Sequence, residues 1–323
     1  MTQLISVIIT TYKAVDHLLC AVRSLLRTDI CKEFYKFEVV IYGDGGGEKS
    51  ETVIHQCAQV LQDAGITFIV TYEPQNLGLV AALNAACKMA RGEWLFVVND
   101  DMVFPSGWMT AVARYLKPRR ILSLACIEPP LMGRTSASCF YANNLGLDPL
   151  AFDFESLDKF QQTIVAEVDL VAGVNYPFLI ESEIFRELGQ ADERFLGPYH
   201  DPDLFLRARI LKLEMVRLQT FALYHFSGVS LRFGNQSQIK SQKSIRWIQK
   251  ENDSRLIFIK KWGAKPKAKF GYIPQTKVDE IWDFKSASFF KKMNYILLVG
   301  WEIFRNRWRL NLHKLKFKMN SFI

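Results

Sequence analysis

The sequence has no long apolar run. None of its stretches approaches the 18 or more apolar residues of a membrane-spanning helix. The first apolar run, residues 5–12, lacks the basic flank and small-residue cleavage site of a signal peptide. The six cysteines all lie before residue 140 and include no C-x-x-C pair, so no zinc or redox motif is indicated. We therefore expect a cytoplasmic protein with reduced thiols.

Several recognition motifs are also missing. The glycine-rich stretch GDGGG (43–47) follows an apolar run, but G-x-G-x-x-G does not occur. The sequence contains no nucleic-acid-binding motif, internal repeat or low-complexity tract. These absences argue against a dinucleotide fingerprint and against a nucleic-acid partner.

Charge is present but unevenly placed. Residues 240–323 hold 20 Lys or Arg against 6 Asp or Glu, whereas residues 1–239 hold 21 against 27. The C-terminal part is therefore strongly basic on an otherwise mildly acidic chain. This asymmetry indicates a separate role for the C-terminal part on an anionic surface.

Hydrophobic periodicity predicts an α/β fold. Apolar, β-branched runs typical of buried strands alternate with helical patterns over the first 100 residues. The expected strands are 4–10, 37–42, 66–72 and 94–98, and the expected helices lie near 18–26, 50–64 and 79–90. This alternation predicts right-handed βαβ units, a parallel sheet, and ligands at the carboxyl ends of its strands.

Polar side chains follow these strands. Thr10, Thr11 and Tyr12, then Asp44, then Asp100 and Asp101 should gather at one edge of the sheet, and Asp44 could accept hydrogen bonds from a nucleobase or a ribose. Paired carboxylates at such a position suit Mg²⁺ or Mn²⁺. On these residues alone, a solvated turn or an N-cap for a helix near 107–116 remains an alternative.

The second half is less regular. Loops and short strands are expected over 127–165, then a strand pair at 168–180, a helix at 181–189, a turn at 198–202 before a helix, and a strand at 217–226. Asp201 could serve there as a general base or as a helix cap. His225, at a strand end, could be a ligand or an ordinary structural histidine.

Together these segments resemble a known family. SVIITTYKAVDHLLCAVRSLL, FEVVIYGDGG, NLGLVAALNAACKMARGEWLFVVNDDM, FLIESEIFRELGQADERFLGPYHDPDLFLRAR and YHFSGVSLR occur in the order typical of family 2 glycosyltransferases, over about residues 4–235. These inverting enzymes include bacterial polysaccharide and lipopolysaccharide-type sugar transferases. The resemblance implies a GT-A fold, with a Rossmann-like, mostly parallel sheet flanked by helices. It implies a catalytic domain over 1–239, with a nucleotide-sugar half (about 1–103) and an acceptor half (about 104–239).

The resemblance also implies roles for particular residues. It implies a nucleoside-diphosphate sugar donor and a glycan or lipid-linked acceptor, with a nucleotide-sugar site formed by Thr10, Thr11, Tyr12, Asp44, Asn76, Gly78 and Asp100. It implies a Mn²⁺ or Mg²⁺ ion on Asp101 and His225, and Asp201 as the general base. Contacts to the diphosphate or the acceptor are expected from His200, Arg207 and Arg232. Two positions depart from the family pattern: Asn99 replaces the first Asp of D-x-D, and His200 replaces the first acid before Asp201.

The C-terminal extension, 240–323, is expected to be helical and amphipathic. Aromatic and aliphatic residues recur every three or four positions over 289–315, with Lys and Arg between them. We expect this extension to lie on an anionic membrane surface, which places the protein peripherally on the inner face of the cell membrane. The alternative is a helix packed on the catalytic domain with a solvated basic face.

Two other functions stay open at this point. A nucleotidyltransferase also uses a parallel sheet, a metal and acidic residues, but it usually carries a basic Gly-rich N-terminal loop, where this chain offers only Lys13. A catalytically inactive GT-A-like module that binds glycan or membrane is suggested by Asn99.

Overall fold

The computed structural model describes residues 3–13, 15–28, 35–129, 139–142, 145–226, 245–269, 273–274, 276–278 and 280–320. The strands are β1 Gln3–Thr11, β2 Tyr35–Asp44, β3 Thr67–Glu73, β4 Trp94–Asn99, β5 Met102–Val103, β6 Arg120–Glu128, β7 Cys139–Tyr141, β8 Leu170–Ala172, β9 Phe178–Glu181, β10 Glu214–His225, β11 Ala268–Lys269 and β12 Ile273–Pro274. The helices are α1 Val15–Leu25, α2 Glu48–Asp63, α3 Leu79–Met89, α4 Trp108–Ala113, α5 Phe154–Gln162, α6 Ser182–Glu187, α7 His200–Ile210, α8 Ile245–Trp262 and α9 Phe289–Asn320.

One mixed sheet forms the centre of the molecule. Its order is β3-β2-β1-β4-β9-β6-β10-β5, with β7 beside β6 and β8 beside β10. β3, β2, β1 and β4 are mutually parallel, as the alternating pattern predicts. β9 is antiparallel to both β4 and β6, so it joins the N-terminal parallel half to the second half of the sheet.

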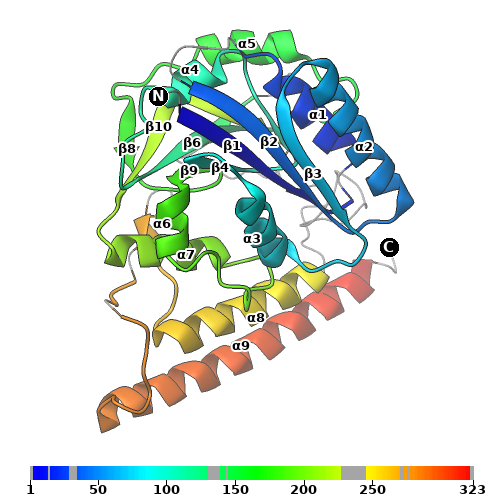
Figure 1. Ribbon diagram of the computed structural model, residues 1–323. Helices are drawn as coiled ribbons and strands as arrows, with labels where there is room; N and C mark the ends of the chain where they lie inside the picture. The colour runs from blue at the N-terminus through cyan, green and yellow to red at the C-terminus, as the bar shows by residue number, and fades with distance from the viewer. Residues whose placement is uncertain are drawn as a thin grey trace.

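Helices cover both faces of this sheet (Figure 1). α1, α2 and α4 pack on one face, where the core is built around Phe96, Phe104 and Trp108. α3, α6 and α7 pack on the other face, around Phe178 and Phe205. Because helices cover both faces of the sheet, the strands predicted from apolar runs are buried on both sides.

Two elements differ from expectation. The region 127–165 is not only loops, because α5 lies within it and β6 reaches Glu128. α5 is short, but Asp153 caps it by accepting hydrogen bonds from the backbone N–H groups of Glu155 and Ser156. Leu157 is its one fully buried residue, with Phe154 and Phe160 packed against the same cluster, so the apolar pattern extends over only two turns of helix.

The C-terminal helices lie outside α3 and α7 (Figure 1). α8 contributes Phe258 and Trp262, each 1% exposed, to the core under α7. α9 then packs along α8. The expected boundary at residue 239 falls within 227–244, outside the described residues. In the described part of the chain, no helix has both the length and the apolar character needed to cross a membrane.

Candidate active site

The carboxyl ends of β1, β2 and β4 lie side by side. Thr10 is in register with Asn99 of β4, and Thr11 with Gly43 of β2. Tyr12, Asp44 and Asp100 directly follow or end these strands. The structure therefore brings together at one edge of the sheet the residues that the sequence placed there.

Asp44 organises the loop that precedes α3. Its carboxylate accepts hydrogen bonds from the Asn76 side chain (2.9 Å), the Leu77 N–H (2.6 Å) and the Gly78 N–H (3.0 Å). Asp44 is only 2% exposed. Its described contacts thus hold the loop that carries Asn76 and Gly78, and a direct contact from Asp44 to a base or ribose stays a prediction.

The glycines after Asp44 are required by the backbone. Gly45 and Gly46 have φ of 79° and 114°, a region that L side chains rarely adopt. A Cβ on Gly46 would also lie 2.9 Å from the Cβ of Ser50. The stretch GDGGG is therefore a tight turn that brings the end of β2 against the 74–76 loop.

Asp100 and Thr11 form a second contact at this edge. The Thr11 hydroxyl hydrogen-bonds to Asp100, which favours its charged form. Burial and then the neighbouring Asp101 carboxylate outweigh that bond and raise the pKa of Asp100 to about 8. Burial and the adjacent carboxylate thus make ionisation of Asp100 less favourable, and the Thr11 hydroxyl only partly offsets this.

Asp101 meets His225 through strand pairing. β5 runs antiparallel to the end of β10 with Met102 opposite His225, and the Phe226 N–H donates to the Asp101 carbonyl (3.1 Å). His225 Nε2 consequently lies 3.3 Å from Asp101 Oδ1, and Asn99 Nδ2 lies 3.5 Å from the same ring nitrogen. The structure thus brings the two expected metal ligands together, with Asn99 at their side.

Glu128 completes this group. Its Oε1 lies 3.0 Å from His225 Nδ1, on the side of the ring away from Asp101. Burial disfavours the charged imidazole, but the Asp101 and Glu128 carboxylates raise the pKa of His225 to about 10. Sequence reasoning missed Glu128, although its signal resembles that of Asp100: a carboxylate at the end of an apolar run, 121–127.

These residues fit a divalent cation. Two atoms bound to one octahedral Mg²⁺ or Mn²⁺ ion lie roughly 3 Å apart, close to the separation of Asp101 Oδ1 and His225 Nε2. A carboxylate on the second ring nitrogen, here Glu128, is the usual support of a metal-binding histidine. No group of three potential ligands occurs among the described residues. An ion held by two protein ligands would take its others from water or a diphosphate.

Asp201 lies in a different group of side chains. It is half-buried in the first turn of α7, beside Tyr176. Burial, and then the charge of Asp201, raise the pKa of the Tyr176 phenol well above its usual range. The helix N-terminus favours a carboxylate here, as a general base requires.

His200 is buried next to Asp201. Its Nδ1 donates to the carbonyl of Gly197, which leaves Nε2 to accept from the Tyr176 hydroxyl at 2.8 Å. The ring is 5% exposed. Both of its nitrogens have protein partners, so His200 orders the start of α7, and the expected contact to an acceptor has no support from its surroundings.

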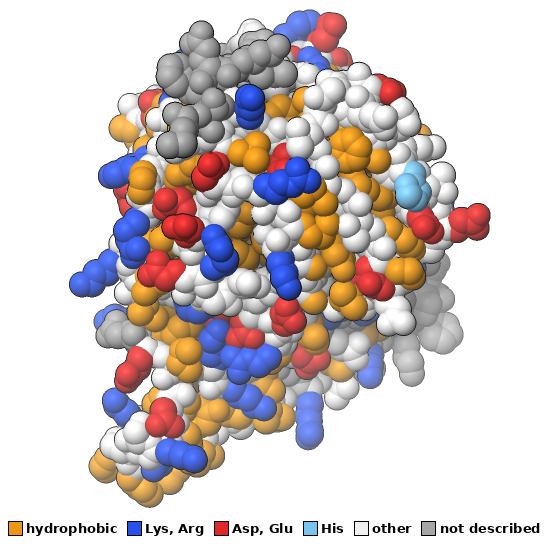
Figure 2. Space-filling view, viewed as in Figure 1, with side chains coloured by type: hydrophobic (Ala, Val, Ile, Leu, Met, Phe, Trp, Pro, Cys, Tyr) orange, Lys and Arg blue, Asp and Glu red, His pale blue; other side chains and the backbone are white. Residues whose placement is uncertain are grey.

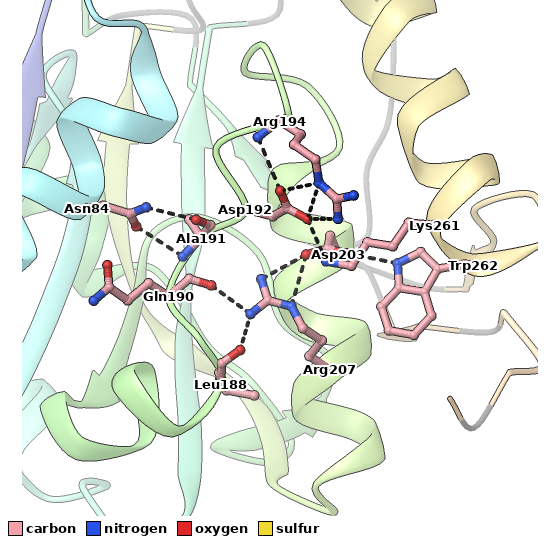
Figure 3. Close-up of polar contacts among 10 residues, drawn as sticks. All are labelled: Asn84, Leu188, Gln190, Ala191, Asp192, Arg194, Asp203, Arg207, Lys261 and Trp262. Atoms are coloured by element: carbon pink, nitrogen blue, oxygen red, sulfur yellow. Dashed lines mark hydrogen bonds and ion pairs between the residues drawn. The ribbon is translucent and has the colours of Figure 1, made fainter. Parts of the chain in front are cut away.

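Arg207 likewise has internal partners (Figure 3). It donates to Asp203 (2.8 Å from Nη2, 3.0 Å from Nε) and to the carbonyls of Leu188 and Gln190. These contacts tie α7 to the loop after α6. The expected contact from Arg207 to an anionic group of the substrate therefore has no support in the described geometry. Arg232 lies outside the described residues.

Asp203 is the centre of a buried polar network. It is fully buried and contacts Lys261 Nζ (2.7 Å) and the indole N–H of Trp262 (2.9 Å), besides Arg207 (Figure 3). Lys261 also contacts Asp192 at 2.8 Å. The sequence gives no signal for this network, because its members are separated by up to 70 residues and meet only when α8 docks on α7.

Comparison with known proteins agrees with this geometry. Residues 6–134 match the glycosyl transferase family 2 model. This segment contains β1 to β4, the Asp44 loop and the Asn99-Asp100-Asp101 stretch. No curated protein sequence matches the chain.

Solved structures share the fold. A mannosyltransferase from Pyrobaculum calidifontis, in complex with GDP-Man and Mn²⁺, is 13% identical, covers 79% of this chain and 63% of its own, and has a TM-score of 0.51. GalNAc-T7 with UDP, GalNAc and Mn²⁺ is 12% identical over 81% of this chain and 48% of its own, with a TM-score of 0.52. TarS from S. aureus is 15% identical over 80% of this chain and 72% of its own, with a TM-score of 0.46.

The family match covers the N-terminal segment, and the two structures with TM-scores of 0.51 and 0.52 share the fold. Over residues 6–134 the chain is therefore similar to glycosyl transferase family 2, and it shares its fold with the solved mannosyltransferase and GalNAc-T7 structures.

Proposed function

We propose that this protein is an inverting glycosyltransferase that moves a sugar from a nucleoside-diphosphate sugar to a hydroxyl of a glycan or lipid-linked acceptor. The observation that carries the proposal is the group Asp101, His225 and Glu128, at the sheet edge where Thr11 and Asp44 also end their strands. We assign the donor site to this edge. We assign the catalytic domain to 1–239 and the extension to 240–323.

Asp201 is the proposed general base. Its carboxylate takes the proton from the acceptor hydroxyl as that oxygen bonds to the sugar C1. The bond from C1 to the diphosphate oxygen breaks at the same time, so the configuration at C1 inverts and the nucleoside diphosphate leaves. His200 and Tyr176, which hydrogen-bond each other at 2.8 Å, fix the turn that carries Asp201.

Asp101 and His225 are the proposed ligands of a divalent cation, with Glu128 orienting the histidine. When bound, such an ion would neutralise charge on the diphosphate. Asn99 at the first D-x-D position offers an amide in place of a carboxylate, so the pair Asp101 and His225 supplies the protein ligands without it.

The first experiment is a panel of nucleotide sugars tested for binding and for hydrolysis with and without Mn²⁺ or Mg²⁺. UDP and GDP sugars come first, because the mannosyltransferase was crystallised with GDP-Man and GalNAc-T7 with UDP. We expect one nucleoside diphosphate to bind, more tightly with metal. The transferase proposal fails if none binds under either condition.

Asp201→Asn tests the base. We expect donor binding to be unchanged and transfer to fall by a factor of about 10² to 10⁴. Glu183→Gln, which changes an exposed acid in the first turn of α6, is the matched control. Normal transfer by Asp201→Asn would assign the base to another residue. Release of pyrophosphate from a nucleoside triphosphate would favour a nucleotidyltransferase. Binding of a nucleotide sugar without any turnover would favour a catalytically inactive module.

The extension is proposed to hold the enzyme on an anionic membrane surface. One face of α9 is occupied by its contacts with α8: Glu302 with Arg255 (2.9 Å), Asn306 with Asn252 (3.1 Å) and Arg309 with Glu251 (2.6 Å). The opposite face is apolar and exposed. Its members follow steps of three and four and are 43–79% exposed: Phe290, Met293, Leu297, Trp301, Phe304 and Trp308.

Charge favours lipid over a second copy of the chain as the occupant of this face. α9 holds eight Lys or Arg and a single acid, Glu302, which is fully buried. Two such helices would repel each other, whereas anionic headgroups attract both. Trp and Phe between basic residues are the side chains that settle at a membrane interface. Figure 2 shows the hydrophobic side chains over the protruding start of α9.

Flotation of the full-length protein with vesicles tests this surface. We expect binding to phosphatidylglycerol-containing vesicles, weaker binding to phosphatidylcholine alone, and loss of both in Trp301→Ser/Phe304→Ser/Trp308→Ser. The matched control is Leu150→Ser/Val165→Ser, which removes apolar side chains that are 67% and 88% exposed on the catalytic domain. Unchanged flotation of the triple variant would overturn the proposal. A wild-type dimer in solution would also overturn it if the triple variant is monomeric and the control variant remains a dimer.

A further inference from the structure

The helix α8 does more than connect the catalytic domain to α9. Its contacts with the domain follow a line along the helix. Near its end, Lys261 contacts Asp203. Two turns earlier, Arg255 donates to the Tyr199 hydroxyl (3.4 Å), and Ser254 Oγ accepts from the Leu196 N–H (3.1 Å). Towards its N-terminus, α8 therefore passes from α7 to the 196–199 loop.

The same loop reaches the donor edge. A Cβ on Gly197 would lie 3.8 Å from the Leu79 side chain, and Leu79 follows Gly78, whose N–H donates to Asp44. The next turn of α8 beyond Ser254 is thus directed at the Asp44 loop. That turn carries Lys250, about 6 Å along the helix axis from Ser254.

Lys250 projects from the side of α8 that faces the domain. It precedes Lys261 by eleven residues, which is close to three full helical turns, so the two side chains leave the helix in nearly the same direction. Lys261 is buried against the domain, with its side chain 5% exposed. Lys250 itself is half-buried.

The electrostatic surroundings of Lys250 agree with this position. Burial, and then the nearby Arg246, lower the pKa of Lys250, whereas Tyr12 and Asp44 raise it. Tyr12 and Asp44 belong to the donor edge. Lys13 is there too, with its Nζ 5.1 Å from the Tyr12 ring centroid.

Asp44 is the acid whose charge acts on Lys250, but it forms no ion pair with it among the described residues. Lys13, Arg246 and Lys250 form no ion pair there, and the Asp44 carboxylate accepts from the 76–78 loop. Lys250 is half-buried, and Lys13 and Arg246 are exposed, so their charged groups are accessible to an anionic ligand, with which they would form charge-assisted hydrogen bonds. A phosphate group is the anion that a nucleotide sugar would bring to this edge.

We infer that α8 supplies part of the donor site, with Lys250 and Arg246 contacting the phosphate groups of the nucleotide sugar. This inference rests on the proposed function, because the phosphate is that of the proposed donor. It assigns a substrate-binding role to the C-terminal extension, separate from the membrane face of α9.

Calorimetric titration of the full-length protein with UDP and GDP, and with uridine and guanosine, tests the inference. For the nucleotide that the wild type binds, Lys250→Met should weaken diphosphate binding about tenfold, leave nucleoside binding unchanged, and be partly rescued by Lys250→Arg. Arg246→Met should act in the same direction. Lys260→Met, at an exposed position of α8, is the control and should change neither.

The outcomes separate the two proposals. If the wild type binds no nucleotide at all, the proposed function fails together with this inference. If the wild type binds a diphosphate and Lys250→Met binds it equally tightly, only the inference fails. Equal weakening of diphosphate and nucleoside would also overturn it, because a phosphate contact acts on the diphosphate alone.

Discussion

Single buried side chains decide how α7 is held against α8 and the loop after α6. Asp203 is fully buried and has Arg207, Lys261 and Trp262 as partners. A buried charge that loses its partner costs far more than a surface ion pair is worth. The short sequence HDPDLFLR therefore contains one acid of proposed catalytic use, Asp201, and one of structural use, Asp203.

Asp203→Asn should destabilise the protein strongly. The change leaves the charges of Lys261 and Arg207 without their buried carboxylate, and we expect the free energy of unfolding to fall by about 3–5 kcal/mol. Urea unfolding followed by circular dichroism measures this, with Glu183→Gln as the exposed control. A loss below about 1 kcal/mol would mean that Asp192 alone can neutralise Lys261.

Asp192 should make stability depend on pH. Although burial opposes its charge, hydrogen bonds from Arg194 and Lys261 hold the pKa of Asp192 well below the usual aspartate range. Its contribution is therefore complete above the unfolded-state pKa and is lost as the pH falls through the lower folded-state value. The difference in unfolding free energy between wild type and Asp192→Asn should shrink as the pH falls from about 5 towards about 3. A difference that is constant over this range would contradict the assignment.

Glu128 should matter to metal binding without being a ligand. Glu128→Gln removes the carboxylate that orients His225, so affinity for Mn²⁺ should fall about 10- to 100-fold. Calorimetric titration of the protein with Mn²⁺ measures this. Glu155→Gln, an acid in the first turn of α5, is the control. Unchanged affinity would show that Glu128 does not orient His225 for the ion.

At the level of elements, α8 and α9 differ in how they are attached. α8 places Phe258 and Trp262 in the core, whereas α9 is fastened mainly by polar contacts such as Glu302 with Arg255. The aromatic side chains of α8 are buried in the core of the domain, whereas these polar contacts join α9 to α8. The two helices should therefore respond differently to mutation.

Glu302→Gln should loosen α9 and leave the catalytic domain folded. Arg255 loses its charged partner, so amide hydrogen exchange in α9 should accelerate while the melting temperature of the domain changes little. Phe258→Ala, in α8, should instead lower the free energy of unfolding by about 3–5 kcal/mol. Equal effects of both changes on global unfolding would show that α9 is part of the same cooperative unit.

Sequence reasoning succeeded where periodicity is strong. β1 to β4 and their helices repeat apolar residues at regular intervals, so their order and the edge formed by Thr11, Asp44 and Asp100 follow from the sequence. The pairing of Asp101 with His225 was assigned by family resemblance, since residues 124 positions apart carry no local sign of contact. Glu128, Tyr176 and the Asp203 network were missed for the same reason: their partners come from distant elements.

At the scale of the whole molecule, α8 joins two surfaces with different proposed uses. Its N-terminal turns lie towards the donor edge, and its outer side carries α9. A rigid helix pair of this kind fixes the angle between the donor edge and any surface on which α9 lies. A lipid-linked acceptor would then enter from a constant direction relative to the proposed base, Asp201, on α7.

The pairing of β5 with β10 has one more consequence. Met102 stands opposite His225, and a slip of one residue along either strand would turn the imidazole to the other face of the sheet, away from Asp101. An ion held between them would therefore act as a reporter of strand alignment. The paramagnetic signal of bound Mn²⁺ should disappear from variants that shift this ladder even when they remain folded, which gives a spectroscopic measure of how faithfully the two halves of the sheet are joined.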